Sequence, residues 1–155
     1  MARFSTNNDM AGTKQAMAAA YKTLLAITAA TATLTTGKVV DFTFGTPGTP
    51  ADNPMEWDVS RQTAAGTSTA ATPTGLDGRW RASGMVGAVN FTAEGTITAG
   101  SSVFYVPSNQ RATYRLSLNP GFEFDIPNTN LAGFAFRGRS ATYTGTSGVQ
   151  AYHEE

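Results

Sequence analysis

The amino-acid sequence predicts a mainly β protein: an antiparallel β-sandwich of about eight strands, similar to a jelly roll, with one N-terminal helix. Three observations support this prediction. After Gly37, apolar and polar residues alternate in short runs, clusters of Gly and Pro separate the runs, and no helical pattern lies between them. Because parallel neighbours need long crossovers, usually helices, the missing helical segments favour antiparallel pairing.

The N-terminal part of the chain has a different pattern. Residues 1–12 are polar and we expect them to form an N-terminal arm, while residues 13–155 are expected to form a single β-sandwich domain that includes the helix. The helix is predicted at about residues 13–30, because Ala is abundant there and because four large side chains share helical spacing. These side chains are Met17, Tyr21, Leu24 and Leu25.

The predicted strands follow one another to the end of the chain. The clearest alternation runs from Ala112 to Leu118 and ends at the turn Asn119-Pro120-Gly121. The other expected strands lie at about residues 40–44, 57–61, 89–98, 103–107, 122–126, 132–136, 140–143 and 149–153. Residues 63–88 show no clear period, and we expect a long excursion with one short strand. Residues 63–70 and 92–99 match at six of eight positions, which we attribute to composition rather than to a repeat.

Composition and charge exclude several classes of function. The chain has 155 residues, its 11 basic and 11 acidic residues cancel, and only 14% of its residues are charged. A neutral chain lacks a basic footprint, so we expect no specific nucleic-acid partner. The sequence has no Cys and one His, so we expect no metal site, no cofactor and no enzymatic activity. No apolar run is long enough to span a bilayer, so we expect no membrane partner.

The charges are nevertheless arranged in blocks. Residues 1–38 sum to +3, residues 41–77 to −4, residues 79–139 to +3 and the last two residues to −2. Every cation after Lys38 is an Arg, the residue best suited to planar hydrogen-bonded ion pairs. Two interpretations remain open: ordinary surface solubility, or acid–arginine contacts between subunits.

No motif indicates a catalytic centre. Glu56 with Asp58, and Glu123 with Asp125, are spaced as pairs on one face of a strand, which we interpret as the solvated side. We expect His153 to lie in a tail or terminal strand, away from any Ser-His-Asp arrangement.

Several segments of the sequence resemble those of small structural proteins of tailed phages and phage-like genomes. The segments are Tyr21-Lys-Thr-Leu-Leu25, residues 49–53, residues 56–66, Asn109-Gln-Arg-Ala-Thr-Tyr-Arg115, Pro120-Gly-Phe-Glu123 and the final Glu154-Glu155. The resemblance covers most of residues 15–155 and implies a head-associated β-sandwich that binds the capsid lattice, with no catalytic residues. The chain departs from the resemblance near residues 77–84, where Gly78-Arg79-Trp80-Arg81 replaces a more acidic and alanine-rich loop.

We therefore expect a non-enzymatic virion structural protein, a phage capsid or capsid-decoration protein made in the host cytoplasm and located in the virion. Its expected partners are copies of itself and a major capsid protein or other virion component. The alternative is a carbohydrate- or receptor-binding sandwich, adhesin-like or fibre-like, in which Trp80 and loop tyrosines stack on a glycan. The candidate assembly contacts are Tyr21, Leu24, Leu25, Arg79, Trp80, Arg81, Arg137 and Arg139.

Overall fold

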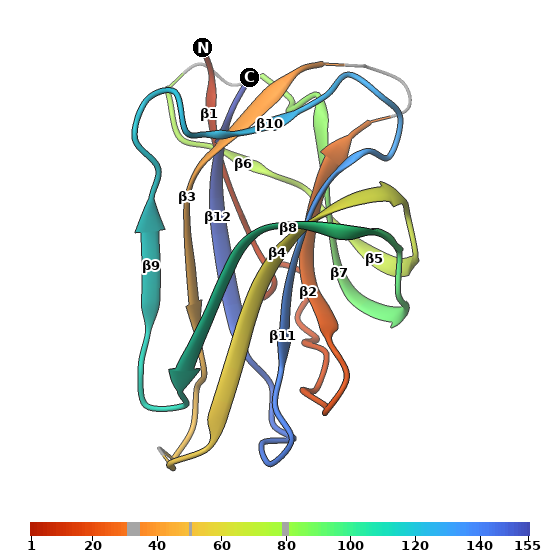
Figure 1. Ribbon diagram of the computed structural model, residues 1–155. Helices are drawn as coiled ribbons and strands as arrows, with labels where there is room; N and C mark the ends of the chain where they lie inside the picture. Colours follow the sequence, from red (N-terminus) through yellow and green to blue (C-terminus); the bar gives the residue numbers. More distant parts are fainter. Residues whose placement is uncertain (31–34, 50, 79–80) are drawn as a thin grey trace.

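The computed structural model describes residues 1–30, 35–49, 51–78 and 81–155, and in these residues it contains two antiparallel six-stranded sheets and no helix (Figure 1). The mainly β, antiparallel part of the prediction is confirmed. The two sheets lie face to face and enclose one cluster of buried apolar side chains.

The first sheet contains both ends of the chain. In spatial order its strands are β10 (Phe124–Ile126), β3 (Gly37–Gly45), β12 (Gly148–Glu154), β1 (Arg3–Asn7) and β6 (Thr74–Gly75), and β9 (Tyr114–Ser117) also pairs with β3. β1 pairs with β12 along its whole length, from Arg3 opposite Glu154 to Asn7 opposite Gln150. Residues 3–7 of the expected N-terminal arm, residues 1–12, therefore form a strand inside this sheet, where Phe4 and its neighbours are buried.

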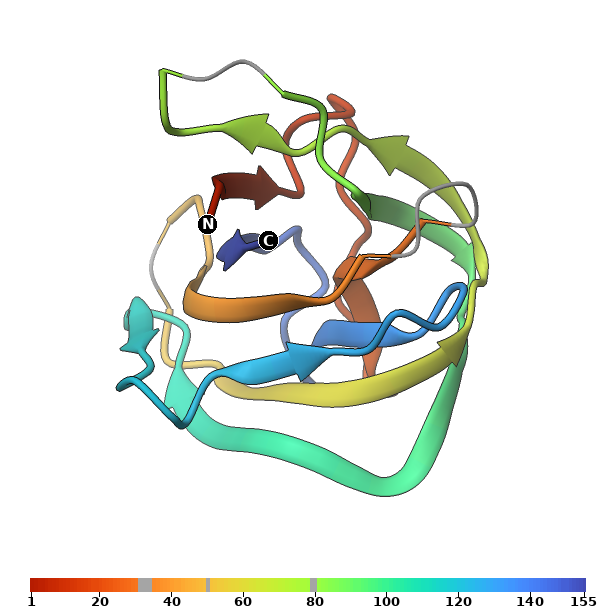
Figure 2. The ribbon, with the colours of Figure 1, turned by 90° about the horizontal axis from the view of Figure 1, so that it is seen from above.

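The second sheet is built around two buried strands. Its order is β5 (Thr67–Ala71), β7 (Met85–Ala93), β2 (Lys22–Ala29), β11 (Gly133–Arg139), β4 (Pro54–Ala64) and β8 (Thr96–Asn109). β4 leads into β5, β7 leads into β8, and these segments pair with each other as one bent ribbon. Figure 2 shows this ribbon curving around β2 and β11.

The ribbon bends where the two matching octapeptides meet. Ala64 lies opposite Thr96 and Thr67 lies opposite Ala93, so residues 63–70 and 92–99 face each other. A Cβ on Gly95 would lie 2.7 Å from the backbone oxygen of Ala64, which leaves no room for a larger residue. The close backbone approach at the bend explains why both octapeptides contain a glycine, so no sequence repeat is needed to explain the match.

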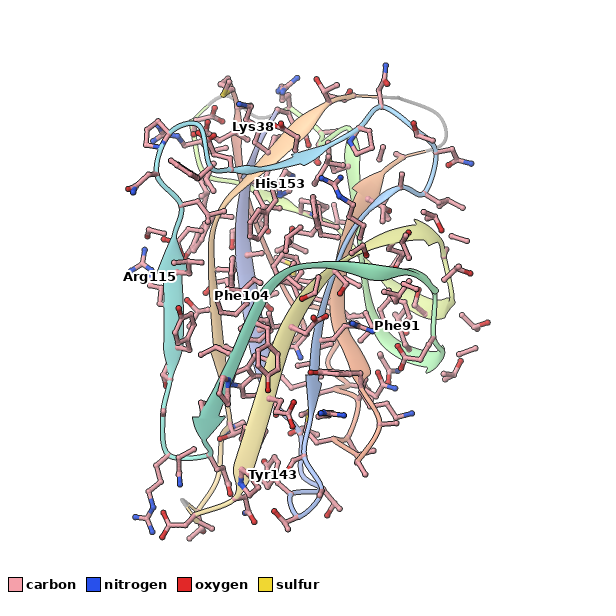
Figure 3. The ribbon with its side chains drawn as sticks, in the orientation of Figure 1. Lys38, Phe91, Phe104, Arg115, Tyr143 and His153 are labelled. Atoms are coloured by element: carbon pink, nitrogen blue, oxygen red, sulfur yellow. The ribbon has the colours of Figure 1, made fainter. Side chains whose placement is uncertain are left out.

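The core is dominated by aromatic rings from both sheets. Phe44 of β3 stacks on Trp57 of β4, with ring centroids 5.0 Å apart, and Phe42 packs edge-on against Phe136 of β11 at 5.6 Å. Phe104 of β8 contacts Phe42 at 5.1 Å, so the edge strand also contributes to the core (Figure 3). Phe42, Phe44, Trp57 and Phe136 are alternating residues of predicted strands, and Phe104 lies in the strand expected at residues 103–107.

The predicted helix at residues 13–30 is wrong. Residues 22–29 form strand β2, and its residues 23–29 are all buried. A strand buried on both faces has a continuous apolar run instead of alternation, so its periodicity does not separate it from a helix. The strand expected at residues 140–143 is also absent, since Ser140 begins a turn in which its hydroxyl accepts hydrogen bonds from the amides of Thr142 and Tyr143.

Candidate functional site

The most elaborate polar arrangement lies on the outer face of the second sheet. We call it the acid–arginine cluster: Tyr21, Glu56, Asp58, Tyr105, Arg137 and Arg139. The register of β4 and β11 creates it, because Arg137 lies directly opposite Asp58 and Arg139 lies opposite Glu56. Side chains two residues apart on a strand point to the same face, so the two ion pairs stand side by side.

Asp58 is the buried anion of the cluster, with a side chain only 5% exposed. It accepts hydrogen bonds from Arg137 Nε at 2.8 Å, from Ser60 Oγ at 2.7 Å and from Ser102 Oγ at 2.5 Å. Three converging donors, one of them cationic, offset the cost of burying this carboxylate. The interpretation of Asp58 as a solvated residue is therefore wrong.

Glu56 is the more exposed anion and links the remaining members. Its Oε2 accepts hydrogen bonds from Arg139 Nη2 at 2.8 Å, from Tyr105 at 3.0 Å and from Tyr21 at 3.4 Å. The hydrogen bond from Arg139 holds the pKa of Glu56 below its ordinary value, and the Glu56 carboxylate raises the pKa of Tyr105. The Glu56 carboxylate is therefore ionised at neutral pH and held in place by these hydrogen bonds.

Tyr21 fills the space over the two arginines. The guanidinium carbons of Arg137 and Arg139 lie 4.8 Å and 4.7 Å from the centroid of its ring, within the range of cation–π attraction. Burial raises the pKa of its hydroxyl, which stays protonated and donates to Glu56. Sequence reasoning named these three residues as contact candidates, and the structure brings them together.

The other candidate contacts do not join them. Leu24 and Leu25 are 1% and 0% exposed in the core, so neither can contact another molecule. Arg81 is exposed and lies 3.6 Å from Glu155. Arg79 and Trp80 lie outside the described residues.

Acid–arginine contacts form within this chain. Arg115 and Arg111 pair with Asp41 and Asp52 at 2.8 Å and 2.9 Å. Hydrogen bonds from Arg115 and Ser117 outweigh the opposing effect of burial and lower the pKa of Asp41, whose side chain is 12% exposed. Figure 3 shows Arg115 on the outer side of β9.

A buried contact between a histidine and a carboxylate lies near the chain ends. His153 is fully buried on β12, where it stacks on Phe4 with ring centroids 5.3 Å apart, and its Nε2 lies 3.3 Å from Glu155 Oε1. Its terminal-strand location agrees with the expectation. Within the described residues His153 Nδ1 has no hydrogen-bond partner. His153 is also one of the residues that line a cleft of about 330 Å³, together with Arg3, Val40, Asp41, Leu76, Arg115, Tyr152 and Glu154.

A cleft of about 250 Å³ adjoins the acid–arginine cluster. Glu56 and Arg139 form its polar wall, and its other lining residues are Ala19, Pro54, Ser140 and Ala141. Tyr105 is not one of the lining residues; it is 54% exposed, and its hydroxyl donates a hydrogen bond to Glu56. Sequence reasoning missed Glu56 and Tyr105 as site residues. The shared spacing of Glu56-x-Asp58 and Arg137-x-Arg139 is the signal that could have indicated their pairing.

A contrasting surface runs along the bent ribbon. Residues 62–76 and 82–109 contain a single charged residue, Glu94, whose carboxylate accepts hydrogen bonds from the Thr23 amide and the Gln15 side chain. We call these two segments the uncharged ribbon. Its exposed apolar side chains include Val103 at 38% and Val86 at 37%. The outer edge of β8 pairs with no strand in the described part of the chain.

Within residues 1–30, 35–49, 51–78 and 81–155, no three His, Asp or Glu side chains are grouped so that they could hold a metal ion. Within the same ranges, no helix has the length and hydropathy needed to cross a membrane.

The chain was compared with protein-family models, with curated proteins and with solved structures, and none of the three comparisons gave a match.

Proposed function

We propose that the protein is a non-enzymatic virion structural protein, a jelly-roll-like capsid or capsid-decoration sandwich that works through self-association and contacts with a capsid neighbour. The uncharged ribbon is the observation that supports this proposal. It places a 14-residue edge strand, β8, at the surface without one charged side chain. Edge strands of monomeric proteins commonly carry Lys or another charge that discourages association.

The edge of β8 favours contact through side chains over strand addition. Its register with β4 shifts at Val103, and Pro107 lacks the amide that a further ladder would need. Ala and Val side chains present no polar group to desolvate, and Thr and Ser hydroxyls can replace water by a hydrogen bond across an interface, so covering such a surface avoids the larger cost of burying a charge. A second copy or a capsid protein could therefore cover the ribbon at low cost.

Sedimentation of the purified full chain tests this proposal. We expect the wild-type protein to self-associate with rising concentration, and to form rings or shells in electron micrographs or to co-sediment with capsids. The double variant Thr98→Lys, Val103→Lys places two like charges on the ribbon and should weaken association at least about tenfold. Both positions are exposed, so folding should be unaffected.

A matched variant distinguishes local repulsion from a change in net charge. Thr129→Lys, Thr144→Lys adds the same charge at exposed turn positions outside the ribbon and should associate as the wild type does. A wild-type chain that stays monomeric at its highest soluble concentration and never binds capsids would exclude the proposal. Equal weakening in both double variants would exclude the ribbon as the contact surface.

A further inference from the structure

A cleft of about 480 Å³ lies at the end of the sandwich that carries both chain ends. Figure 1 shows the two ends of the chain and β10 at this end of the molecule. Both sheets contribute to the lining: Gly37, Lys38, Asp125, Ile126 and Glu154 come from the first sheet, and Arg61 comes from β4 of the second. The volume is within the range of small-molecule sites.

Arg61 takes a core-facing position of β4 without an acidic partner. Val59 and Trp57, two and four residues before it, are buried in the core, and Phe134 of the core lies directly opposite Arg61 on β11. Residues at this spacing share one face of a strand, so Arg61 continues the core-facing row at the end of the sheet. Its guanidinium carbon lies 5.2 Å from the centroid of the Phe134 ring.

The Arg61 guanidinium has free hydrogen-bonding capacity. In the described part of the chain its side chain forms no ion pair and no hydrogen bond, and the Phe134 ring is its polar group's contact. A guanidinium carries five N–H donors in a planar fork, and two of them match the two oxygens of a carboxylate. The aromatic ring beneath the fork restricts its orientation before a ligand arrives, so less conformational entropy is lost on binding.

The acids of the lining are already engaged. Asp125 Oδ1 lies 3.8 Å from Lys38 Nζ, and Glu154 Oε1 lies 2.9 Å from Arg3 Nε. The side chain of Glu155 is 1% exposed. The unpaired guanidinium therefore selects the charge of a ligand, and it favours an anion. A second negative charge on the ligand would face Asp125, whose side chain is 75% exposed, so a monoanion fits better than a dianion.

The remaining lining is suited to an apolar ligand body. Pro127 and Met1 are exposed there, and the alkyl stem of Lys38 lies beside them. Covering this surface with an aliphatic chain or an aromatic ring removes apolar area from water. We propose that this cleft binds a small monocarboxylate with an apolar body, and that Arg61 holds its carboxylate through paired hydrogen bonds.

Titration of the full chain with carboxylates and alcohols of the same skeleton tests the site. The probes are octanoate and benzoate, each compared with its alcohol, octan-1-ol or benzyl alcohol, at neutral pH with amide chemical shifts as the readout. At least one carboxylate should give saturable shifts centred on residues 36–38, 61 and 124–126. Its alcohol should bind at least about tenfold more weakly, and Arg61→Gln should weaken binding of the carboxylate by a similar factor.

A matched variant changes an arginine elsewhere. Arg111→Gln removes the same charge from an exposed side chain outside the lining and should bind the carboxylate as the wild type does. Circular dichroism and thermal unfolding of each variant separate lost binding from lost folding.

Three results would each exclude the carboxylate site. These are the absence of a saturable shift with either carboxylate, alcohols that bind the wild type as tightly as the carboxylates do, and a folded Arg61→Gln variant that keeps wild-type affinity. Equal weakening by Arg111→Gln would assign the effect to net charge and would exclude the role of Arg61. None of these results bears on self-association.

Discussion

Replacing Glu155 by Gln should remove a measurable, pH-dependent part of the stability. The Glu155 side chain is 1% exposed and accepts hydrogen bonds from Ser83 Oγ and, at 2.8 Å, from the Gly84 amide. His153 Nε2 lies 3.3 Å away. Burial alone would raise the pKa of Glu155, but these partners outweigh it and lower the pKa from 4.5 to about 2.

The magnitude follows from linkage between protonation and folding. A fall in the pKa of Glu155 from 4.5 to about 2 corresponds to about 3 kcal/mol of stability. Because the folded-state pKa is the lower one, this contribution is complete above the unfolded-state value of 4.5. It is lost as the pH falls toward about 2, where the carboxylate becomes protonated in the folded chain as well.

Urea unfolding, followed by tryptophan fluorescence at several pH values, measures the effect. The Glu155→Gln variant keeps the shape of the side chain but cannot ionise, so it should be about 3 kcal/mol less stable than the wild type at neutral pH. This difference should shrink to below about 1 kcal/mol near pH 2. Asp52→Asn, which removes an exposed pair with Arg111, should cost less than about 1 kcal/mol at neutral pH. A Glu155→Gln deficit that is equal at both ends of the pH range would refute the reasoning.

Two further stability predictions concern the second sheet. Asp58→Ala should lower the free energy of unfolding by about 3 to 5 kcal/mol, because it leaves the buried Arg137 charge without its partner. Adding Arg137→Met should recover part of that loss. A double variant less stable than Asp58→Ala would contradict this explanation. Gly95→Ala should cost about 1 to 3 kcal/mol because its Cβ would press on the Ala64 carbonyl. Gly78→Ala, whose Cβ would meet nothing within 4 Å, should stay within about 0.5 kcal/mol of the wild type in the same assay.

Much of the fold could be predicted because alternation of apolar and polar residues indicates a strand with one buried and one solvent-exposed face. Phe42 and Phe44 alternate with Asp41 and Thr43, and the structure contains this strand as β3. Alternation fails where a strand is covered on both faces, as in β2, whose residues Lys22–Ala29 resemble an Ala-rich helix. The tertiary environment, which a single sequence does not display, decides between these two structures.

The candidate site was predictable only in part, for a related reason. Tyr21, Arg137 and Arg139 were predicted as separate candidate contacts, but their role depends on which strand lies beside β11. The neighbour is β4, 70 or more residues earlier in the chain, and its register brings Glu56 and Asp58 opposite the two arginines. Spacing within each strand was visible in the sequence, whereas the pairing of the strands was not.

The ion pairs also change the interpretation of the charge blocks. Acids of the −4 block, residues 41–77, pair with arginines of the following +3 block: Asp41–Arg115, Asp52–Arg111, Glu56–Arg139 and Asp58–Arg137. The complementarity that suggested contacts between subunits is thus satisfied within one chain. An ion pair already formed gains little from a second partner, since that partner must compete with an existing hydrogen-bonded neighbour. Association through the uncharged ribbon would break none of these pairs, which is why we propose the ribbon, and not the ion pairs, as the contact surface.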